Sequence, residues 1–361
     1  MGAFEEKYST RGRARLRFEM MHGGAISNGW TGNRDLARRR RRYPLNLHGV
    51  ASMPIDWAII PIILVVAVAD AILLAETSFR LEASSQLRIL AGLIPLAVVL
   101  VICCRWRSFP RTTHRLAHLA RTVLALVLFT NAVSILSYIL TGILPLPRWD
   151  EALATADRAL GLNWLDMYLW VTRYPAIEAS AHAVYMSLGP ETLILFFALE
   201  LLGHHNQARA FLLWFIVSTI AALAIGTLVP AAGAFVYYHL PVASTTGYVA
   251  QWADLRNGAL CTINPLNNQG LVIFPSFHTV LAVLCAYAAR PLRILKIPLL
   301  ALNLLIILSA PAMGGHYFID IIAGTILAIL TISLPGYILS GKWRRLNKNM
   351  RHGDVPVFSS K

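Results

Sequence analysis

The chain has 361 residues, of which 57% are hydrophobic and only 14% are charged. Soluble globular domains carry about 25% charged residues, so this composition excludes an ordinary soluble domain and indicates an integral membrane protein. The formal net charge is +14. The basic residues follow a membrane topology, as shown below, and we therefore expect no nucleic-acid partner.

Residues 1–53 form a basic, glycine-containing segment without a sustained apolar period. We expect this cytoplasmic tail to be largely disordered. Its arginine run at 38–42 lies just ahead of the first apolar span. We interpret the run as a topogenic anchor with some attraction to anionic lipid, rather than as a nucleic-acid patch. The long lead before the first span argues against an ordinary secretory signal peptide.

The apolar runs of the chain are long enough to cross a membrane, because a hydrocarbon core of ~30 Å takes about 20 helical residues. Eight such runs lie at 56–76, 87–104, 122–145, 181–202, 210–230, 272–290, 294–313 and 316–339. The run that contains Pro190 is the weakest, although membrane helices tolerate proline. The sequence therefore predicts an all-α polytopic membrane bundle of about eight transmembrane helices, followed by a second cytoplasmic tail at 340–361.

The distribution of Lys and Arg predicts the orientation of the bundle. With the N-terminus inside, 26 of the 32 basic residues fall in segments that the alternation of spans places in the cytoplasm. The other six lie in loops or helix ends placed outside: Arg80, Arg88, Arg148, Arg158, Arg173 and Arg256. This asymmetry follows the positive-inside rule. We expect a plasma (inner) membrane protein with both termini in the cytoplasm.

The first long outer connection, 147–164, is expected to form an amphipathic helix on the outer surface. Its apolar residues recur at near-helical spacing: Leu153, Ala156, Leu160 and Leu162. Its charged residues fall on the opposite side: Asp150, Glu151, Asp157 and Arg158.

The second outer connection, 231–271, is rich in Gly, Asn and Pro and has no periodic apolar pattern. We expect a loop. At about forty residues it is unusually long, which favours a lid or a functional site over a simple connector.

The first polar intrusion into the apolar runs is "PSFH" at 275–278. Pro275 suits the opening position of a helix, where its missing N–H is not needed. The unpaired backbone N–H groups of the first turn, with Ser276 among them, favour an anion. His278 follows within the same turn, which the charge topology places at the outer surface.

The second polar intrusion is "GGHYFID" at 314–320, also at the outer start of a helix. His316 and Asp320 are four residues apart, so their side chains can share one helical face and hydrogen-bond. A carboxylate on one imidazole nitrogen fixes the tautomer and leaves the other nitrogen available as a nucleophile or base. Without such a partner, Asp320 inside a membrane helix would be costly.

Two histidines are thus expected at similar depth, on different helices and on the same side of the membrane. A lone interfacial histidine more often packs and hydrogen-bonds than reacts. Two of them, with a carboxylate partner and an anion-favouring helix start, suit a nucleophile and a general acid acting on a phosphate ester. Other polar residues of the spans, Asn131, His182, Tyr185 and Glu191, could line a cavity, but we interpret them as packing residues rather than catalytic ones.

At these two motifs the sequence resembles the type 2 phosphatidic acid phosphatase superfamily. It is most similar to the branch that contains fungal inositol phosphorylceramide synthase and bacterial relatives. The phrases "VPAAGAF" at 229–235 and "LRNG" at 255–258 also resemble that branch. The resemblance implies a six-helix catalytic core at 119–339 and leaves 54–118 as two additional transmembrane helices.

The resemblance also implies roles for residues of the two motifs. His316 would attack phosphorus to give a phosphohistidine, Asp320 would orient His316, and His278 would protonate the leaving oxygen. Ser276 and nearby backbone amides would hold phosphate oxygens. The chemistry of the superfamily needs no metal and no cofactor.

The sequence departs from the superfamily pattern at the cationic phosphate ligands. A first motif with Lys and Arg is not found, and Ala310 stands where the superfamily has an arginine six residues before the histidine of the third motif. Because an anionic phosphate still needs donors, we nominate Arg256 of the outer loop and, more weakly, Tyr317.

The sequence therefore predicts a membrane enzyme that breaks a phosphoester of a lipid phosphate or phospholipid at the extracytoplasmic face. The acceptor stays open: water would make the protein a phosphatase, and an alcohol would make it a headgroup phosphotransferase. The missing arginine slightly favours the transferase. The alternative is a non-enzymatic membrane protein, either a lipid transporter or a histidine-liganded metal or haem protein. The lack of an internal repeat argues against the transporter, and stoichiometric metal would favour ligation.

Overall fold

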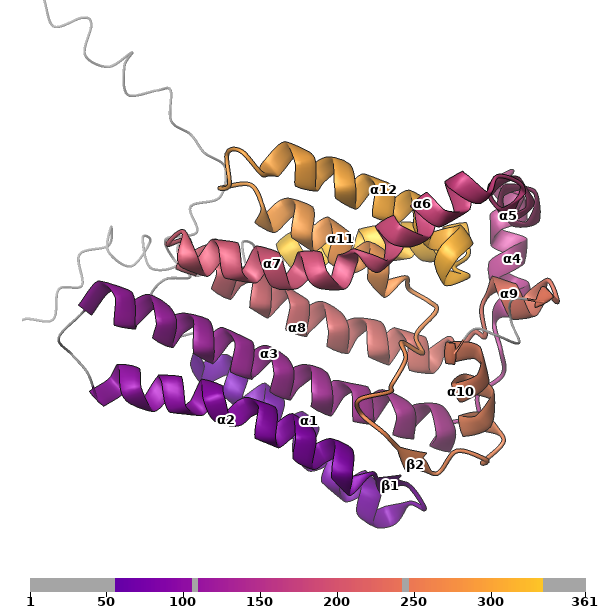
Figure 1. Cartoon of the computed structure of the whole chain (residues 1–361). Coiled ribbons are helices and arrows are strands. Elements are labelled where there is room, and N and C mark those ends of the chain that lie inside the picture. The colour runs from indigo at the N-terminus through magenta and orange to yellow at the C-terminus, as the bar shows by residue number, and fades with distance from the viewer. Residues whose placement is uncertain (1–55, 106–109, 242–246, 334–361) are drawn as a thin grey trace, which may run out of the picture. The chain divides into compact units, whose positions relative to one another are not determined.

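The computed structural model describes residues 56–105, 110–241 and 247–333, and Figure 1 shows their arrangement. The predicted tails at 1–53 and 340–361, with the arginine run, lie outside the described residues. Helices account for nearly all regular structure in the described part. The strands there are β1 (Arg80–Leu81) and β2 (Thr262–Ile263), which pair in parallel. The predicted all-α polytopic membrane bundle is confirmed.

Each of the eight predicted spans corresponds to a helix or a pair of helices in the described residues. Five helices are long and apolar enough to cross a membrane: α1 (Asp56–Glu76), α2 (Ala83–Arg105), α3 (Pro110–Ile143), α8 (His205–Leu228) and α12 (Lys296–Gly314). A sixth span arises if α6 (Pro175–Met186) and α7 (Leu188–Leu201) count as one. The remaining two runs, 272–290 and 316–339, contain shorter apolar helices, α11 (Phe277–Ala288) and the helix Phe318–Ser333. Both begin a few residues into the predicted run, at the polar histidine motif.

The break between α6 and α7 bends this span by 41°. Pro190 explains its position, because a proline ring clashes with the carbonyl four residues earlier, and α6 ends at that residue, Met186. Pro190, which made 181–202 the weakest predicted span, therefore divides this span into two helices.

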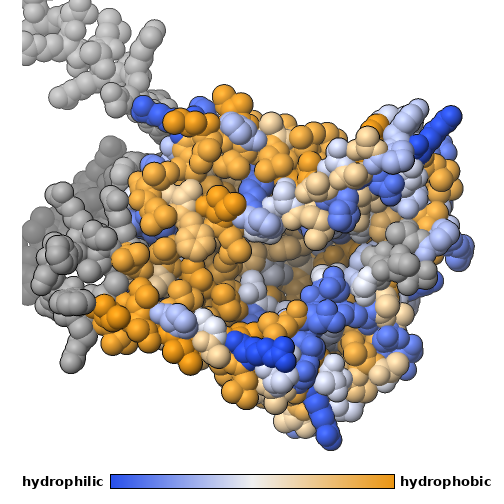
Figure 2. All heavy atoms as spheres, in the orientation of Figure 1, coloured by the Kyte–Doolittle hydropathy of each residue, from blue (hydrophilic) through white to orange (hydrophobic). Residues whose placement is uncertain are grey.

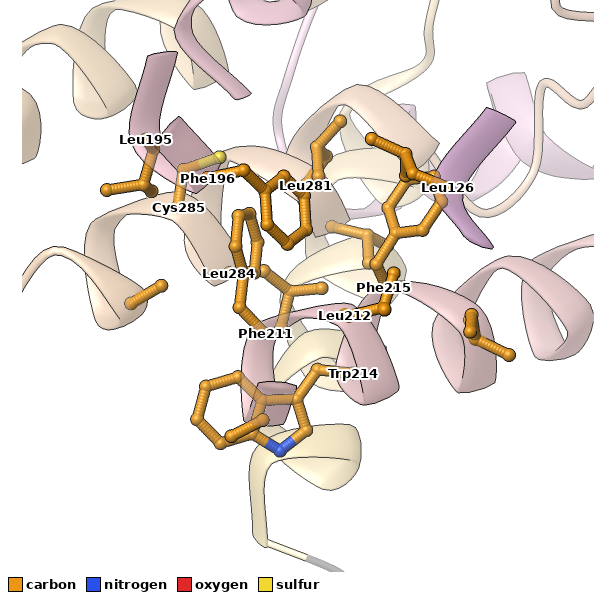
Figure 3. Close-up of a cluster of buried hydrophobic side chains, with 14 of the residues drawn as sticks. Leu126, Leu195, Phe196, Phe211, Leu212, Trp214, Phe215, Leu281, Leu284 and Cys285 are labelled. Carbon is orange, nitrogen blue, oxygen red and sulfur yellow. The ribbon is translucent and has the colours of Figure 1, made fainter. Parts of the chain in front are cut away.

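The largest hydrophobic core lies where α3, α7, α8 and α11 meet (Figure 3). Aromatic pairs fill it: Phe196 stacks on Phe211 with ring centres 4.4 Å apart, and Phe129 meets Phe215 edge to face at 6.0 Å. Figure 2 shows an apolar surface over the helical bundle, with hydrophilic residues gathered at the end where α4 (Asp150–Ala159) and α10 (Gly247–Arg256) lie. Such an outer surface suits contact with lipid rather than water.

The predicted amphipathic helix of the first outer connection is present as α4 and is followed by α5 (Trp164–Arg173). The assignment of its faces is partly wrong. Asp150 and Asp157, which we expected on the solvent side, are buried together with Leu153. Their carboxylates accept hydrogen bonds from backbone amides of distant segments, described below, and such partners are not visible in a local pattern.

The second outer connection is not the irregular loop that we expected. It contains the short helix α9 (Ala234–Tyr237), α10 and strand β2. α10 shows no apolar period, yet it buries Trp252 and Leu255 in a second hydrophobic cluster with Phe79 and Tyr138. Tertiary packing therefore stabilises a helix that the local pattern does not indicate.

Candidate active site

His278 lies in the first turn of α11. The N-cap of this helix is Ser276, which is fully buried. Its hydroxyl accepts hydrogen bonds from the Thr279 amide, at 3.4 Å, and from the Thr279 hydroxyl, at 3.2 Å. Pro275 precedes the cap instead of occupying the first helical position. The Ser276 side chain thus completes the helix start, and the structure does not direct it toward the space between the histidines.

His316 lies in the turn between α12 and the last described helix. Gly315 adopts the left-handed conformation, with φ 64°, which permits the predicted reversal. The Nδ1 atom of His316 is 3.0 Å from the Ile273 carbonyl oxygen. A carbonyl oxygen only accepts hydrogen bonds, so Nδ1 carries the proton and Nε2 keeps a lone pair.

The environment of His316 keeps the imidazole neutral. Burial lowers the pKa of His316 to about 4, because desolvation disfavours the charged ring. At neutral pH the ring is therefore an uncharged base with Nε2 unprotonated. That is the form a nitrogen nucleophile needs.

Asp320 lies close to His316 but is not its hydrogen-bond partner. The Asp320 Oδ2 atom is 3.6 Å from His316 Nδ1, which is too long for a hydrogen bond. The same oxygen accepts a 2.7 Å hydrogen bond from the Tyr317 amide. The expected side-chain bond is replaced because His316 precedes the helix instead of lying in its first turn, where the four-residue spacing would align the two groups.

The structure brings together the two predicted histidines. The ring centres of His278 and His316 are 6.2 Å apart, with the ring planes tilted by 56°. Both rings line one cavity of about 560 Å³. Its wall is formed by α3, α6, α8, α10, the start of α11, the end of α12 and the segment 268–273, and Figure 2 shows a hollow on this face.

Arg256 and Tyr317, our nominees for the phosphate ligands, do not reach this cavity. The Arg256 guanidinium donates to the Leu146 carbonyl at 2.6 Å, lies over the Trp252 ring, and lines a different and much smaller hollow. Tyr317 is fully buried, and its hydroxyl donates to Asp150 at 3.0 Å. Residue chemistry suggested both, but their side chains are directed elsewhere.

The backbone around His316 is held by residues that the sequence reasoning missed. The Trp164 indole donates to the His316 carbonyl at 2.8 Å. This indole is fully buried and stacks between Tyr168 and Tyr238, with ring centres 5.2 and 5.3 Å away. The four-residue spacing of Trp164 and Tyr168 was a signal of an aromatic face, but nothing in it indicates the carbonyl.

The two buried acids of α4 hold the same region. Asp157 accepts from the amides of Phe318 and Ile319, each at 2.8 Å, and so caps the last described helix from a distance. Burial raises the pKa of Asp157, and these two hydrogen bonds oppose the shift. Asp150 accepts from the Ala232 and Gly233 amides as well as from Tyr317.

The wall of the cavity is neutral. Its polar groups are hydroxyls and amides from α3, α6, α8, α10 and the segment 268–270: Ser134, Ser137, Tyr185, Thr219, Tyr248, Asn268 and Gln269. No Lys or Arg is among the described residues that line it. The described residues also hold no group of three or more His, Cys, Asp or Glu side chains that could bind a metal ion.

The fold and the paired histidines define a polytopic membrane protein with a two-histidine cavity. A model of the PAP2 superfamily matches residues 151–334. This match spans half of the chain and includes both histidine motifs, so the protein belongs to the PAP2 superfamily. No curated protein and no solved structure matches the chain.

Proposed function

We propose that the protein is a lipid phosphoesterase or phosphotransferase that works through a phosphohistidine on His316. The observation that supports this best is that the ring centres of His278 and His316 lie 6.2 Å apart. In addition, the Nδ1 atom of His316 is hydrogen-bonded to the Ile273 carbonyl, which leaves Nε2 free to attack. A near-attack contact takes about 3–3.5 Å and a proton-transfer hydrogen bond about 2.6–3.2 Å. Both contacts are short, so the two rings must lie close together beside one cavity, as they do here.

The reaction would run in two displacements. In the first, the Nε2 lone pair of His316 forms a bond to phosphorus, the phosphorus–oxygen bond to the leaving group breaks, and protonated His278 gives its Nε2 proton to that oxygen. In the second, water or an alcohol gives a proton to His278 and attacks phosphorus, and the phosphorus–nitrogen bond breaks. The Asp320 carboxylate, 3.6 Å from His316 Nδ1, would stabilise the positive charge that develops on the imidazole.

The acceptor that we favour is an alcohol, which makes the protein a headgroup phosphotransferase like the inositol phosphorylceramide synthase branch. The neutral cavity wall supports this. A phosphomonoester carries up to two charges and calls for cationic donors, whereas a phosphodiester carries one. The first amides of α11, at Phe277 and His278, have no partner within the helix and offer a site for a singly charged group. The hydroxyls and amides of the wall suit a hydroxylated headgroup.

We also propose that the cavity opens to the extracytoplasmic face, with both termini in the cytoplasm. The support is the concentration of Lys and Arg in the segments on the opposite side. The proposed chemistry uses side chains and backbone groups alone and is independent of metal.

The test is turnover by the purified protein in lipid vesicles. A panel of lipid phosphates and phosphodiesters is offered with and without alcohol acceptors, alongside His316→Ala and His278→Ala. His182→Ala is the matched control, because His182 is an exposed histidine of α6 that does not line the cavity. We expect phosphodiester turnover that needs an alcohol and is lost in both histidine variants. Turnover that neither substitution changes would overturn the proposal.

A further inference from the structure

A second hollow of the molecule is a groove of about 610 Å³ between α11 and α12. It is separate from the histidine cavity, which lies at the start of α11 and the end of α12. The groove instead follows the end of α11 and the start of α12, and the short turn 289–295 joins these two ends. The two helices therefore run antiparallel, and the groove faces the membrane leaflet opposite the histidine cavity.

The walls of this groove are apolar along most of its length. Ala282 and Ala286 are four residues apart, so they lie on one face of α11, and their small side chains leave the space open. The opposite wall comes from α12, which contributes Ile297, Leu300, Leu304 and Ile307. The first three of these are more than a third exposed, which suits a surface that an acyl chain covers.

The groove ends in two cations. Arg290 and Lys296, at the two ends of the turn between α11 and α12, both line it and are exposed. The Arg290 guanidinium lies over the Tyr287 ring at 3.2 Å, and its Nε donates to the Tyr287 carbonyl at 2.9 Å. The N–H groups of its two terminal nitrogens remain for an anion. No ion pair among the described residues involves Arg290 or Lys296, so this end of the groove carries net positive charge.

The length of the groove matches one leaflet. Along α12 it extends from Lys296 to Ile307, and a helix rises about 1.5 Å per residue, so this stretch is about 16 Å long. A hydrocarbon core is ~30 Å thick, of which one leaflet takes about half. An acyl chain that starts beside the two cations would therefore lie along the apolar walls down to the middle of the membrane.

We propose that this groove binds one anionic phospholipid of the leaflet opposite the histidine cavity, with an acyl chain between α11 and α12 and the phosphate at Arg290 and Lys296. Basic residues between transmembrane helices attract anionic headgroups. A zwitterionic lipid gains less, because its own cation offsets the attraction. The inference goes beyond the proposed function and uses no residue of the histidine site, so either can fail without the other.

The first test measures lipid retained by the full chain. The purified protein in detergent is titrated with phosphatidylglycerol or phosphatidylcholine, and native mass spectrometry counts the bound lipid. We expect one phosphatidylglycerol to bind at least roughly 5-fold more tightly than phosphatidylcholine. Arg290→Gln and Lys296→Gln should each weaken its binding by roughly 5-fold, the size expected for one basic residue at an anionic headgroup.

Arg293→Gln is the matched control for charge. Arg293 is an exposed basic residue of the same turn that does not line the groove, so this variant should bind phosphatidylglycerol as the unaltered protein does. An equal loss in Arg293→Gln would mean that the whole basic surface attracts lipid, and would overturn the inference. Equal retention of the two lipids by the unaltered protein would overturn it as well. So would no retained phosphatidylglycerol, because another segment or partner would then cover the groove.

The second test fills the groove and keeps both cations. Ala286→Leu should weaken phosphatidylglycerol binding at least as much as the loss of one cation does. Ala301→Leu is its control, because Ala301 is an exposed alanine of α12 outside the groove. Thermal unfolding in phosphatidylcholine checks the fold of each variant. Unchanged binding in a folded Ala286→Leu protein would refute the groove as the site, and the glutamine variants, which alter only exposed residues, decide the inference if that protein does not fold.

Discussion

His316 and His278 are held by different kinds of group. The Nδ1 atom of His316 donates to the backbone carbonyl of Ile273, and the carbonyl of His316 itself accepts from Trp164. The Nδ1 atom of His278 meets the side-chain hydroxyl of Tyr185. A backbone carbonyl is present whatever the side chain at that position, whereas a hydroxyl is lost in one substitution. The ring of His316 is therefore held by a backbone group, whereas the ring of His278 contacts a side chain that one substitution can alter.

The largest effect is expected from substitution of either histidine, and the two variants should differ in whether phosphoenzyme forms. His316→Gln should abolish turnover and the trapped phosphoenzyme, because no other nitrogen occupies the nucleophile position. His278→Gln should slow an alkyl ester by roughly 10²–10⁴-fold and still form phosphoenzyme with a p-nitrophenyl ester. Rapid-quench labelling with a phosphorus-32 substrate measures both. Phosphoenzyme in the His316 variant would contradict the assignment.

The next effect tests how the turn of His316 is held. Trp164→Phe keeps an aromatic ring between Tyr168 and Tyr238 but removes the donor to the His316 carbonyl. An unsatisfied buried carbonyl costs about 1–3 kcal/mol, and misplacement of the ring should lower kcat by roughly 10-fold. Denaturation and steady-state kinetics measure these changes. Trp170→Phe, at an exposed position of α5, is the control, and an equal loss in both variants would refute the specific role of Trp164.

A smaller effect is expected for the distant helix cap. Asp157→Asn removes the charge that faces the amides of Phe318 and Ile319. It should lower the free energy of unfolding by about 1–2 kcal/mol. Glu151→Gln is the matched control, since Glu151 is an exposed acid of the same helix in an ion pair with Arg158. Glu151→Gln should change the free energy of unfolding much less than Asp157→Asn does, because an exposed ion pair contributes little. Thermal unfolding in detergent compares the two, and a control as damaging as the test variant would count against the cap.

The smallest effect concerns Arg256. Because its guanidinium bonds to the Leu146 carbonyl and lies outside the histidine cavity, Arg256→Gln should change kcat/KM for a phosphodiester by less than about 3-fold, as expected for a residue that contributes no transition-state contact. A loss of 100-fold or more, with unfolding unchanged, would restore Arg256 as a phosphate ligand.

Hydropathy and motif spacing predicted the parts of this molecule that depend on nearby residues. The apolar runs became helices because the membrane requires every backbone group to be bonded within its own segment. The motifs placed His278 and His316 on the two segments that form one wall of the cavity. Pro190 marked the weak span at the place where the helix breaks.

The partners of these residues were beyond local patterns because they come from remote parts of the chain. Ile273 lies 43 residues from His316, Trp164 lies 152 residues from it, and Asp157 lies 161 residues from Phe318. Arg256 and Tyr317 carry hydrogen-bond donors that suit a phosphate, but the sequence does not indicate which way their side chains point. Only the packing of α4, α5 and α10 decides which way such side chains turn.

The uncharged wall of the cavity affects how strongly the protein would attract a charged lipid. With no Lys or Arg among the described residues that line the cavity, a charged lipid gains little from long-range attraction as it enters. Added salt screens attraction between separated charges, and the attraction between the lipid and this wall is already weak. Affinity for a singly charged lipid should then vary only weakly with ionic strength, and discrimination between lipids would depend on how their hydroxyls fit the wall.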